Sequence, residues 1–184
     1  AVGAKNHTLV ERTIGNTITL FACISIISTL LLLIFVKPLV VLLNVPQEAM
    51  TGTVQYLVIS FIGILFITAY NIISSIYRGL GDSKSPMYII VIACLLNIVL
   101  DYLFIGLFHM GPVGAALGTT LSQSVSVIIA LISMKYRTSD IHIKKEDLHL
   151  QPQVFKQILK VGFPVAIQDG CIQVGFIIIT IIAN

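Results

Sequence analysis

Asp101 and Asn97, which lie four positions apart in a long apolar stretch, have the clearest chemical potential in this sequence. The stretch runs from Pro86 to Phe108 and can cross a bilayer, because about 20 residues at 1.5 Å rise span the ~30 Å hydrocarbon layer. An ionised Asp at the centre of a span costs roughly 2.5–3.5 kcal/mol on insertion scales, so such residues usually face a polar pathway or a partner. Residues i and i+4 share one helix face. We therefore expect an Asn–Asp stripe that faces the inside of a helix bundle.

The elements that must position this pair are membrane helices. The chain has 184 residues, of which 57% are hydrophobic and 10% charged, whereas about 25% charged is usual for a soluble domain. This composition predicts an all-α integral membrane protein, a polytopic helix bundle with five spans. We predict neither an enzyme nor a nucleic-acid partner, because the sequence has no nucleophile–base pair and no cofactor loop. The three cysteines fall inside apolar runs at uneven spacing and are interpreted as buried thiols: Cys23, Cys94 and Cys171.

Four spans are predicted before residue 135 and one after it. Their approximate bounds are 17–36, 53–77, 86–108, 113–134 and 161–184. Lys37-Pro38 is expected to close the first span. Residues 135–160 form a predicted cytoplasmic linker, which includes a short amphipathic helix on the membrane surface. The chain starts without Met and stops inside an apolar run, so we expect it to be a piece of a longer transporter-like protein.

The positive charges orient the predicted spans. Ten of the eleven Lys and Arg residues fall in connections on one side of the membrane, and only Lys37 falls on the other. The positive-inside rule makes the ten-residue side cytoplasmic. Residues 1–16, 78–85 and 135–160 are therefore predicted to lie in the cytoplasm of a multi-pass protein of the cell membrane. Asp101 then lies in the outer half of the bilayer.

Two further polar residues extend the Asn–Asp pair into a candidate cation site. Thr119 should lie at a height similar to that of Asp101, whereas Asn71 lies in the inner part of its span and needs helix tilt to approach. A carboxylate with nearby amide and hydroxyl oxygens can coordinate Na⁺, above all between Asp101 and Asn97. Alternatively, the carboxylate alone can carry a proton, because burial in a low dielectric favours its neutral form. For all four residues the competing hypothesis is interhelical hydrogen bonding without a transport role.

Small residues recur at every fourth position of the fourth predicted span, and they predict a seam of close helix packing: Gly114, Gly118, Ser122 and Ser126. Asp169 lies early in the fifth predicted span and is interpreted as a solvated or helix-start residue. No Lys, Arg or His is expected deep in any span, so an anionic substrate would find no fixed countercharge.

Several motifs resemble the multidrug and toxic compound extrusion (MATE) family. RGLGDSKSP ends the second predicted span, NIVLDY lies in the third, and GPVGAALGTTLSQ begins the fourth. The opening GAKNHTLVERTIGN is similar to the family's cytoplasmic loop between helices two and three, and LKVGFPVAIQDG is similar to the start of its helix seven. Order and spacing match over essentially the whole chain.

The resemblance implies helices three to seven of a twelve-helix transporter with two six-helix lobes. Residues 1–134 would belong to the first lobe, and residues 161–184 to the truncated first helix of the second. It further implies export of organic, cationic or amphiphilic small molecules by antiport against Na⁺ or H⁺, with no cofactor beyond that coupling ion. Partners would be the lipid bilayer and the remaining helices of the same transporter. The family's cation site carries over to Asp101, Asn97, Thr119 and Asn71.

Two other functions compete with the antiporter. A flippase of lipid-linked oligosaccharides from the same superfamily commonly needs basic residues in a central cavity. A membrane scaffold without transport activity predicts that Asn97 and Asp101 face a neighbouring helix with every polar group paired.

The family's additional Asp in helix one has no counterpart in this sequence, because that helix is absent from it.

Overall fold

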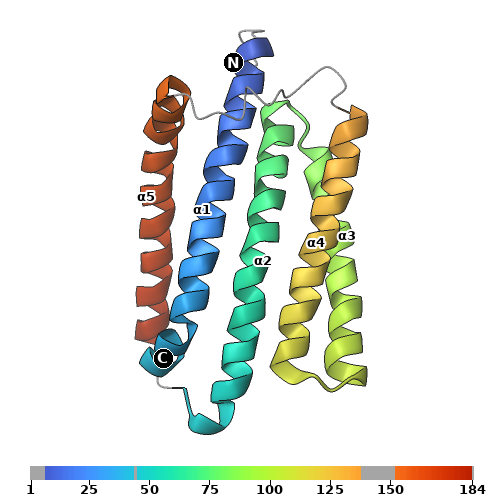
Figure 1. The fold of residues 1–184 in the computed structure, drawn as a ribbon, viewed down its shortest axis with the longest axis vertical. Helices are drawn as coiled ribbons and strands as arrows, with labels where there is room; N and C mark the ends of the chain where they lie inside the picture. Colours follow the sequence, from blue (N-terminus) through green and yellow to red (C-terminus); the bar gives the residue numbers. More distant parts are fainter. Residues whose placement is uncertain (1–6, 44, 138–151, 184) are drawn as a thin grey trace.

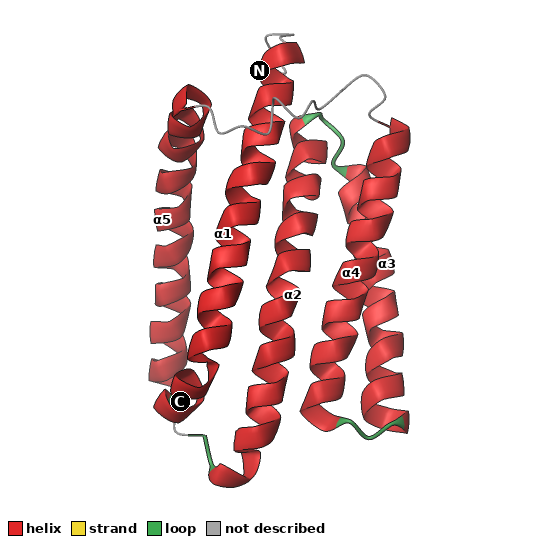
Figure 2. Ribbon diagram, viewed as in Figure 1, coloured by secondary structure: helices red, strands yellow, loops and turns green. Residues whose placement is uncertain are grey.

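The computed structural model of this chain describes residues 7–43, 45–137 and 152–183. In these ranges the chain is helical apart from short connections (Figure 2). The elements in chain order are α1 His7–Leu42, α2 Gln47–Gly79, α3 Lys84–Asp101, the π-helix η1 Tyr102–Leu107, α4 Gly111–Arg137 and α5 Pro152–Ala183.

Four helical stretches in the described ranges are long and apolar enough to cross a membrane: Val10–Leu42, Gln47–Gly79, Lys84–Leu107 and Gly111–Tyr136. Apolar side chains also cover much of their outer surface; Ile34 is 70% exposed and Ile98 65% exposed. Such exposure suits lipid, because in a bilayer apolar residues face outward without cost. The protein is therefore a multi-pass membrane protein, and the prediction of an all-α membrane bundle is confirmed.

The helices run up and down in alternation, as Figure 1 shows. Helix α2 packs against α1 on one side and α4 on the other, and α3 packs mainly on α4. Among the described residues α5 contacts α1 alone. The start of α1, the α2–α3 connection, the end of α4 and the start of α5 lie at one end of the bundle. This is the end that the positive charges predict to be cytoplasmic.

Helix α1 continues where the sequence predicts its end. Pro38 lies inside α1, which extends to Leu42. Proline removes one helical hydrogen bond, but membrane helices tolerate that loss when neighbours hold the segment. Val36 and Val40, which flank Pro38 on one face, are 6% and 0% exposed. Their packing holds the helix together across the proline.

Helix α5 also differs from its prediction. The expected amphipathic surface helix and the fifth span form one helix from Pro152, with Pro164 in its interior. Asp169 therefore lies inside α5 and is exposed, so its interpretation as a helix-start residue is wrong.

The prediction of buried thiols is also wrong, because all three cysteines are exposed. Apolar flanks do not distinguish a lipid-facing position from a core position.

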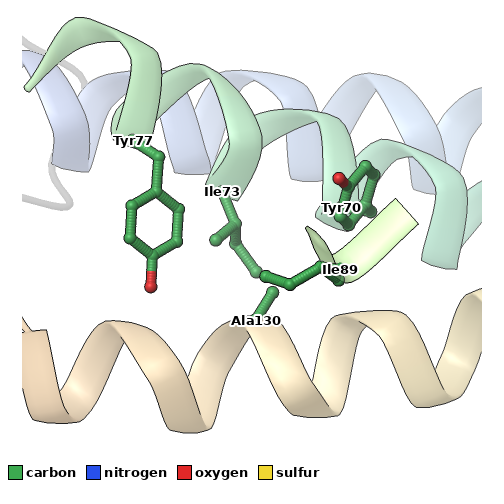
Figure 3. Packing of buried hydrophobic residues seen from close by; sticks show 5 residues of the cluster. All are labelled: Tyr70, Ile73, Tyr77, Ile89 and Ala130. Carbon is green, nitrogen blue, oxygen red and sulfur yellow. The ribbon is translucent and has the colours of Figure 1, made fainter. Parts of the chain in front are cut away.

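A cluster of buried side chains joins the three central helices and contains Tyr70, Ile73, Tyr77, Ile89 and Ala130 (Figure 3). The first three come from α2, Ile89 from α3 and Ala130 from α4. Tyr70 donates a hydrogen bond from its hydroxyl to the Pro86 carbonyl oxygen at 2.8 Å. Tyr77 donates to Ser133 Oγ at 3.0 Å. These bonds fix α2 to the start of α3 and to the end of α4.

Candidate functional site

The position of α3 is fixed at its first turn. Asp82 Oδ1 accepts hydrogen bonds from the backbone nitrogens of Lys84 at 3.1 Å and Ser85 at 3.0 Å. Ser85 Oγ donates to Asp82 Oδ2 at 2.6 Å. Carboxylates at a helix N-terminus satisfy free amide groups and complement the helix dipole. Gly81, with φ +89°, makes the turn into this cap, because that backbone conformation is costly for residues with a Cβ.

At the other end of α3, Asn97 and Asp101 lie on one helix face, as predicted. Both are partly buried. Asn97 Nδ2 and Asp101 Oδ1 are buried and have no hydrogen-bond partner within the described part of the chain. An unpaired buried polar atom costs about 1–3 kcal/mol, and more if it is charged. Native proteins keep few such atoms, and each points to a missing partner or ligand.

The small residues of α4 bring its backbone against this pair. A methyl group added to Gly118 would overlap Asp101 Oδ1 and lie 3.3 Å from its Cγ. One and two turns further along α4, Ser122 and Ser126 are each 2% exposed, and their hydroxyls donate to the backbone oxygens of Thr119 and Ser122 respectively. The predicted packing seam is therefore confirmed.

Asn97 and Thr119 line one small cavity between α2, α3 and α4. Its volume is about 100 Å³. The remaining lining residues are Tyr70, Ile90, Ala93, Cys94, Ser122, Gln123 and Ser126. Asp101 follows Asn97 by one helical turn, and its neighbour Gly118 directly precedes Thr119 in the chain. The structure thus places Asn97 and Thr119 around one cavity and the Asp101 carboxylate against the α4 backbone at Gly118, one residue before Thr119.

Asn71 lies apart from these three. It is exposed on α2 and donates from Nδ2 to the Ile67 carbonyl oxygen at 3.0 Å. It lines a different cavity of about 300 Å³ between α1 and α2, together with Thr17, Phe21, Thr68, Ile72 and Ser75. The described residues therefore do not join Asn71 to the other three predicted site residues.

Tyr70 and Gln123 belong to the small cavity and are missed by sequence reasoning. Gln123 follows Thr119 by four positions, so its place on the same helix face could have been predicted from spacing. Tyr70 gives no such signal, because the sequence of an apolar span does not show which of its aromatic residues will face a cavity once the helices pack.

A π-helix begins directly after Asp101. The backbone nitrogen of Phe108 bonds to the Leu103 oxygen at 2.9 Å, five residues back. This widened turn packs on α4, since a Cβ on Gly114 would lie 3.0 Å from Phe104 Cβ and 3.1 Å from its carbonyl carbon. Isolated π-helical turns within α-helices are frequent at functional sites.

The donor set suits a small monovalent cation or a proton better than a transition metal. It consists of one carboxylate, one amide and one hydroxyl. No group of three His, Cys, Asp or Glu residues gathers in the described part of the chain. Hard cations prefer oxygen ligands, and the three side chains can supply them if the Asn97 amide turns its oxygen inward. They supply fewer ligands than a full coordination shell, so water or further protein oxygens must complete it.

Comparisons of the sequence with a family profile and with curated proteins agree on one protein family. Residues 1–103, more than half of the chain, match the profile of the MatE family. The probable multidrug resistance protein YpnP of Bacillus subtilis is 38% identical over 144 residues, which are 78% of this chain and 32% of that protein. The probable multidrug resistance protein NorM of Thermotoga maritima is 29% identical over 179 residues, covering 95% of this chain and 38% of that protein. The chain thus spans about a third of the length of the curated relatives it matches.

A solved structure supports the fold. A MOP superfamily transporter from Pyrococcus furiosus superimposes with a TM-score of 0.79 at 27% identity, over 89% of this chain and 36% of that one. For that protein, the reverse polarity of the binding pocket is described as suggesting a different function.

Proposed function

We propose, because this chain belongs to the MatE family, that it forms part of a cation-coupled antiporter that exports organic cationic or amphiphilic compounds. Its helices would be helices three to seven of a twelve-helix transporter, in which residues 1–134 contribute to the first lobe and α5 begins the second. The named relatives are multidrug resistance proteins, which supports export of organic compounds. The coupling ion would be Na⁺ or H⁺.

The observation that carries the proposal is the pair of buried atoms without partners, Asn97 Nδ2 and Asp101 Oδ1. A bound cation or proton would relieve the cost of burying the carboxylate. The ion would therefore have higher affinity for the lobe conformation that encloses Asp101 than for one that exposes it. Such a difference in affinity is what an ion needs in order to shift a conformational equilibrium. Asp101 would hold the coupling ion in one state and release it in the other.

The cavities favour a cationic or neutral substrate. Three cavities among the described residues, of about 390, 300 and 100 Å³, are lined by no Lys, Arg or His. A flippase of lipid-linked oligosaccharides, which must hold a diphosphate, would need such residues from helices outside this chain. A scaffold predicts full pairing of Asn97 and Asp101, and their unpaired atoms count against it.

The test is Asp101→Asn in the full-length transporter that contains these helices. The substitution keeps the shape of the side chain but removes its negative charge, and with it the ability to carry a proton or to neutralise the charge of a bound cation. In proteoliposomes with a Na⁺ or a pH gradient imposed separately, we expect coupled export of a fluorescent organic cation to fall to background under whichever gradient drives the wild type. Asp169→Asn is the matched control, because Asp169 is an exposed acid on α5 and export should persist. Export that survives Asp101→Asn would refute the mechanism.

A further inference from the structure

Gly118 lies at the point where α4 meets the Asp101 carboxylate. A Cβ on Gly118 would overlap Asp101 Oδ1 and lie 3.3 Å from Cγ, but it would be 3.4 Å from the Asp101 backbone nitrogen. Carbon atoms in good contact are about 3.5–4.0 Å apart. The overlap is therefore with the carboxylate, whereas the α3 backbone itself would accept a methyl group with little adjustment.

The overlapped atom is also the buried oxygen without a hydrogen-bond partner. Gly118 is buried, so the carboxylate oxygen is covered by the α4 backbone. The next residue of α4, Thr119, lines the cavity that contains Asn97. The absence of a side chain at position 118 thus decides whether the carboxylate can lie against the α4 backbone, one residue before Thr119.

Other glycines at close approaches have different neighbours. A Cβ on Gly114 would meet Phe104 and Met110, and one on Gly63 would meet Thr120 Oγ1 at 2.9 Å. Those contacts serve the packing of uncharged groups.

We propose that Gly118 is a positioning residue for the cation site, and that it acts by letting the Asp101 carboxylate lie against the α4 backbone. This inference rests on the proposed function. Alanine at position 118 forces the carboxylate into another rotamer or moves α3 away from α4. In either case the oxygen that would bind the coupling ion leaves its place against the α4 backbone, whereas Gly118 lines neither of the cavities of about 390 and 300 Å³.

The first measurement compares Gly118→Ala with Gly52→Ala in the full-length transporter reconstituted in proteoliposomes. No atom lies within 4 Å of a Cβ on Gly52, so Gly52→Ala controls for the change of residue type. We expect Gly118→Ala to lower the maximal rate of coupled export roughly ten- to a hundredfold, as expected when a functional group is displaced by about 1 Å. The half-saturating concentration of the fluorescent organic cation should not change. Wild-type export by Gly118→Ala, or a loss that appears only as weaker substrate binding, would overturn the positioning role.

The second measurement is a double-mutant cycle on thermal unfolding in detergent, which needs no transport. Gly118→Ala should lower the unfolding midpoint when Asp101 is present, but not in the Asp101→Ala background, where the overlapping carboxylate is gone. An equal loss in both backgrounds would assign Gly118 to packing alone and overturn the inference. If Gly118→Ala does not insert into the membrane but the double variant Gly118→Ala/Asp101→Ala does, the inference stands. If neither variant inserts, the inference is overturned.

The two proposals fail in different ways. If Asp101→Asn leaves coupled export intact, the proposed function is wrong whatever Gly118→Ala does. If Asp101→Asn abolishes export and Gly118→Ala does not reduce it, the function stands and the positioning role alone is lost.

Discussion

The interface between α3 and α4 and the interface between α1 and α2 differ in the size of the cavities beside them. Small residues of α4 bring two backbones together at α3, and the cavity beside them is about 100 Å³. Beside α1 and α2 lie cavities of about 390 and 300 Å³, the larger of which is also lined by residues of α4. Close packing traps polar atoms such as Asp101 Oδ1 without partners, whereas the looser interface leaves Asn71 exposed. The interface with the smaller cavity is therefore the one that holds the unpaired carboxylate oxygen proposed to bind the coupling ion.

The largest effect should come from filling the tight interface. Ser122 is 2% exposed and lines a cavity of only about 100 Å³, so Ser122→Leu should cost about 2 kcal/mol or more of unfolding free energy through overpacking. Ser75 is exposed and lines the cavity of about 300 Å³, so Ser75→Leu should cost less than about 0.5 kcal/mol. Unfolding of both variants in detergent micelles checks the contrast, and equal losses would mean that the two interfaces are equally tight.

Asn97 and Asn71 test whether binding of the coupling ion also differs between the two interfaces. Asn97→Ala should raise the half-saturating concentration of the coupling ion roughly tenfold, as the loss of a supporting group does at metal sites. Asn71→Ala should change it less than about twofold, since Asn71 lines the other cavity. Initial rates of export at varied Na⁺ and at varied pH provide the measurement. A larger effect from Asn71 would place the ion between α1 and α2.

A smaller effect is expected from Tyr70→Phe, which removes the hydrogen bond to the Pro86 oxygen at the start of α3. Interhelical hydrogen bonds in membrane proteins contribute about 0.6 kcal/mol on average, so the loss should be on the order of 1 kcal/mol or less. Tyr56→Phe is the control, because Tyr56 is 40% exposed. Thermal unfolding should rank the two, and identical midpoints would show that α2 does not fix α3 through this hydroxyl.

The smallest effect should come from Thr29→Val at the loose interface. Thr29 Oγ1 donates to the Phe61 oxygen at 3.3 Å, a long distance for a hydroxyl donor. Replacing it by a side chain of the same shape should cost less than about 0.5 kcal/mol. A loss greater than that of Tyr70→Phe in the same unfolding assay would reverse the ranking of the interfaces.

Much of the fold follows from local sequence, because lengths of apolar runs and the spacing of small residues are local properties. Four of the five predicted spans, the seam at Gly118 and the shared face of Asn97 and Asp101 were predictable in this way. The continuation of α1 through Pro38 was not, since it depends on the burial of Val36 and Val40 against other helices.

The site was predictable only in part for a related reason. Hydropathy cannot separate a lipid-facing position from a core position, so the exposure of Cys23 gave no signal in advance. Helix rotation decides which cavity a polar residue lines, and rotation is set by packing between helices. Counting along the chain did place Asn71 away from Asp101, but it could not show which cavity Asn71 or Tyr70 lines.

The π-helix after Asp101 has a consequence for the length of the chain. Each of its hydrogen-bonded turns contains one residue more than an α-helical turn, so Tyr102–Leu107 holds one residue that a continuous α-helix would not need. Deletion of one residue, such as Ile105, could be absorbed there as an ordinary α-turn, with Asp101 and everything before it left in register. The same deletion before Asn97 would rotate the pair by about 100° and turn it away from α4. The segment after Asp101 can thus lose one residue without changing the register of Asn97 and Asp101, whereas the segment before Asn97 cannot.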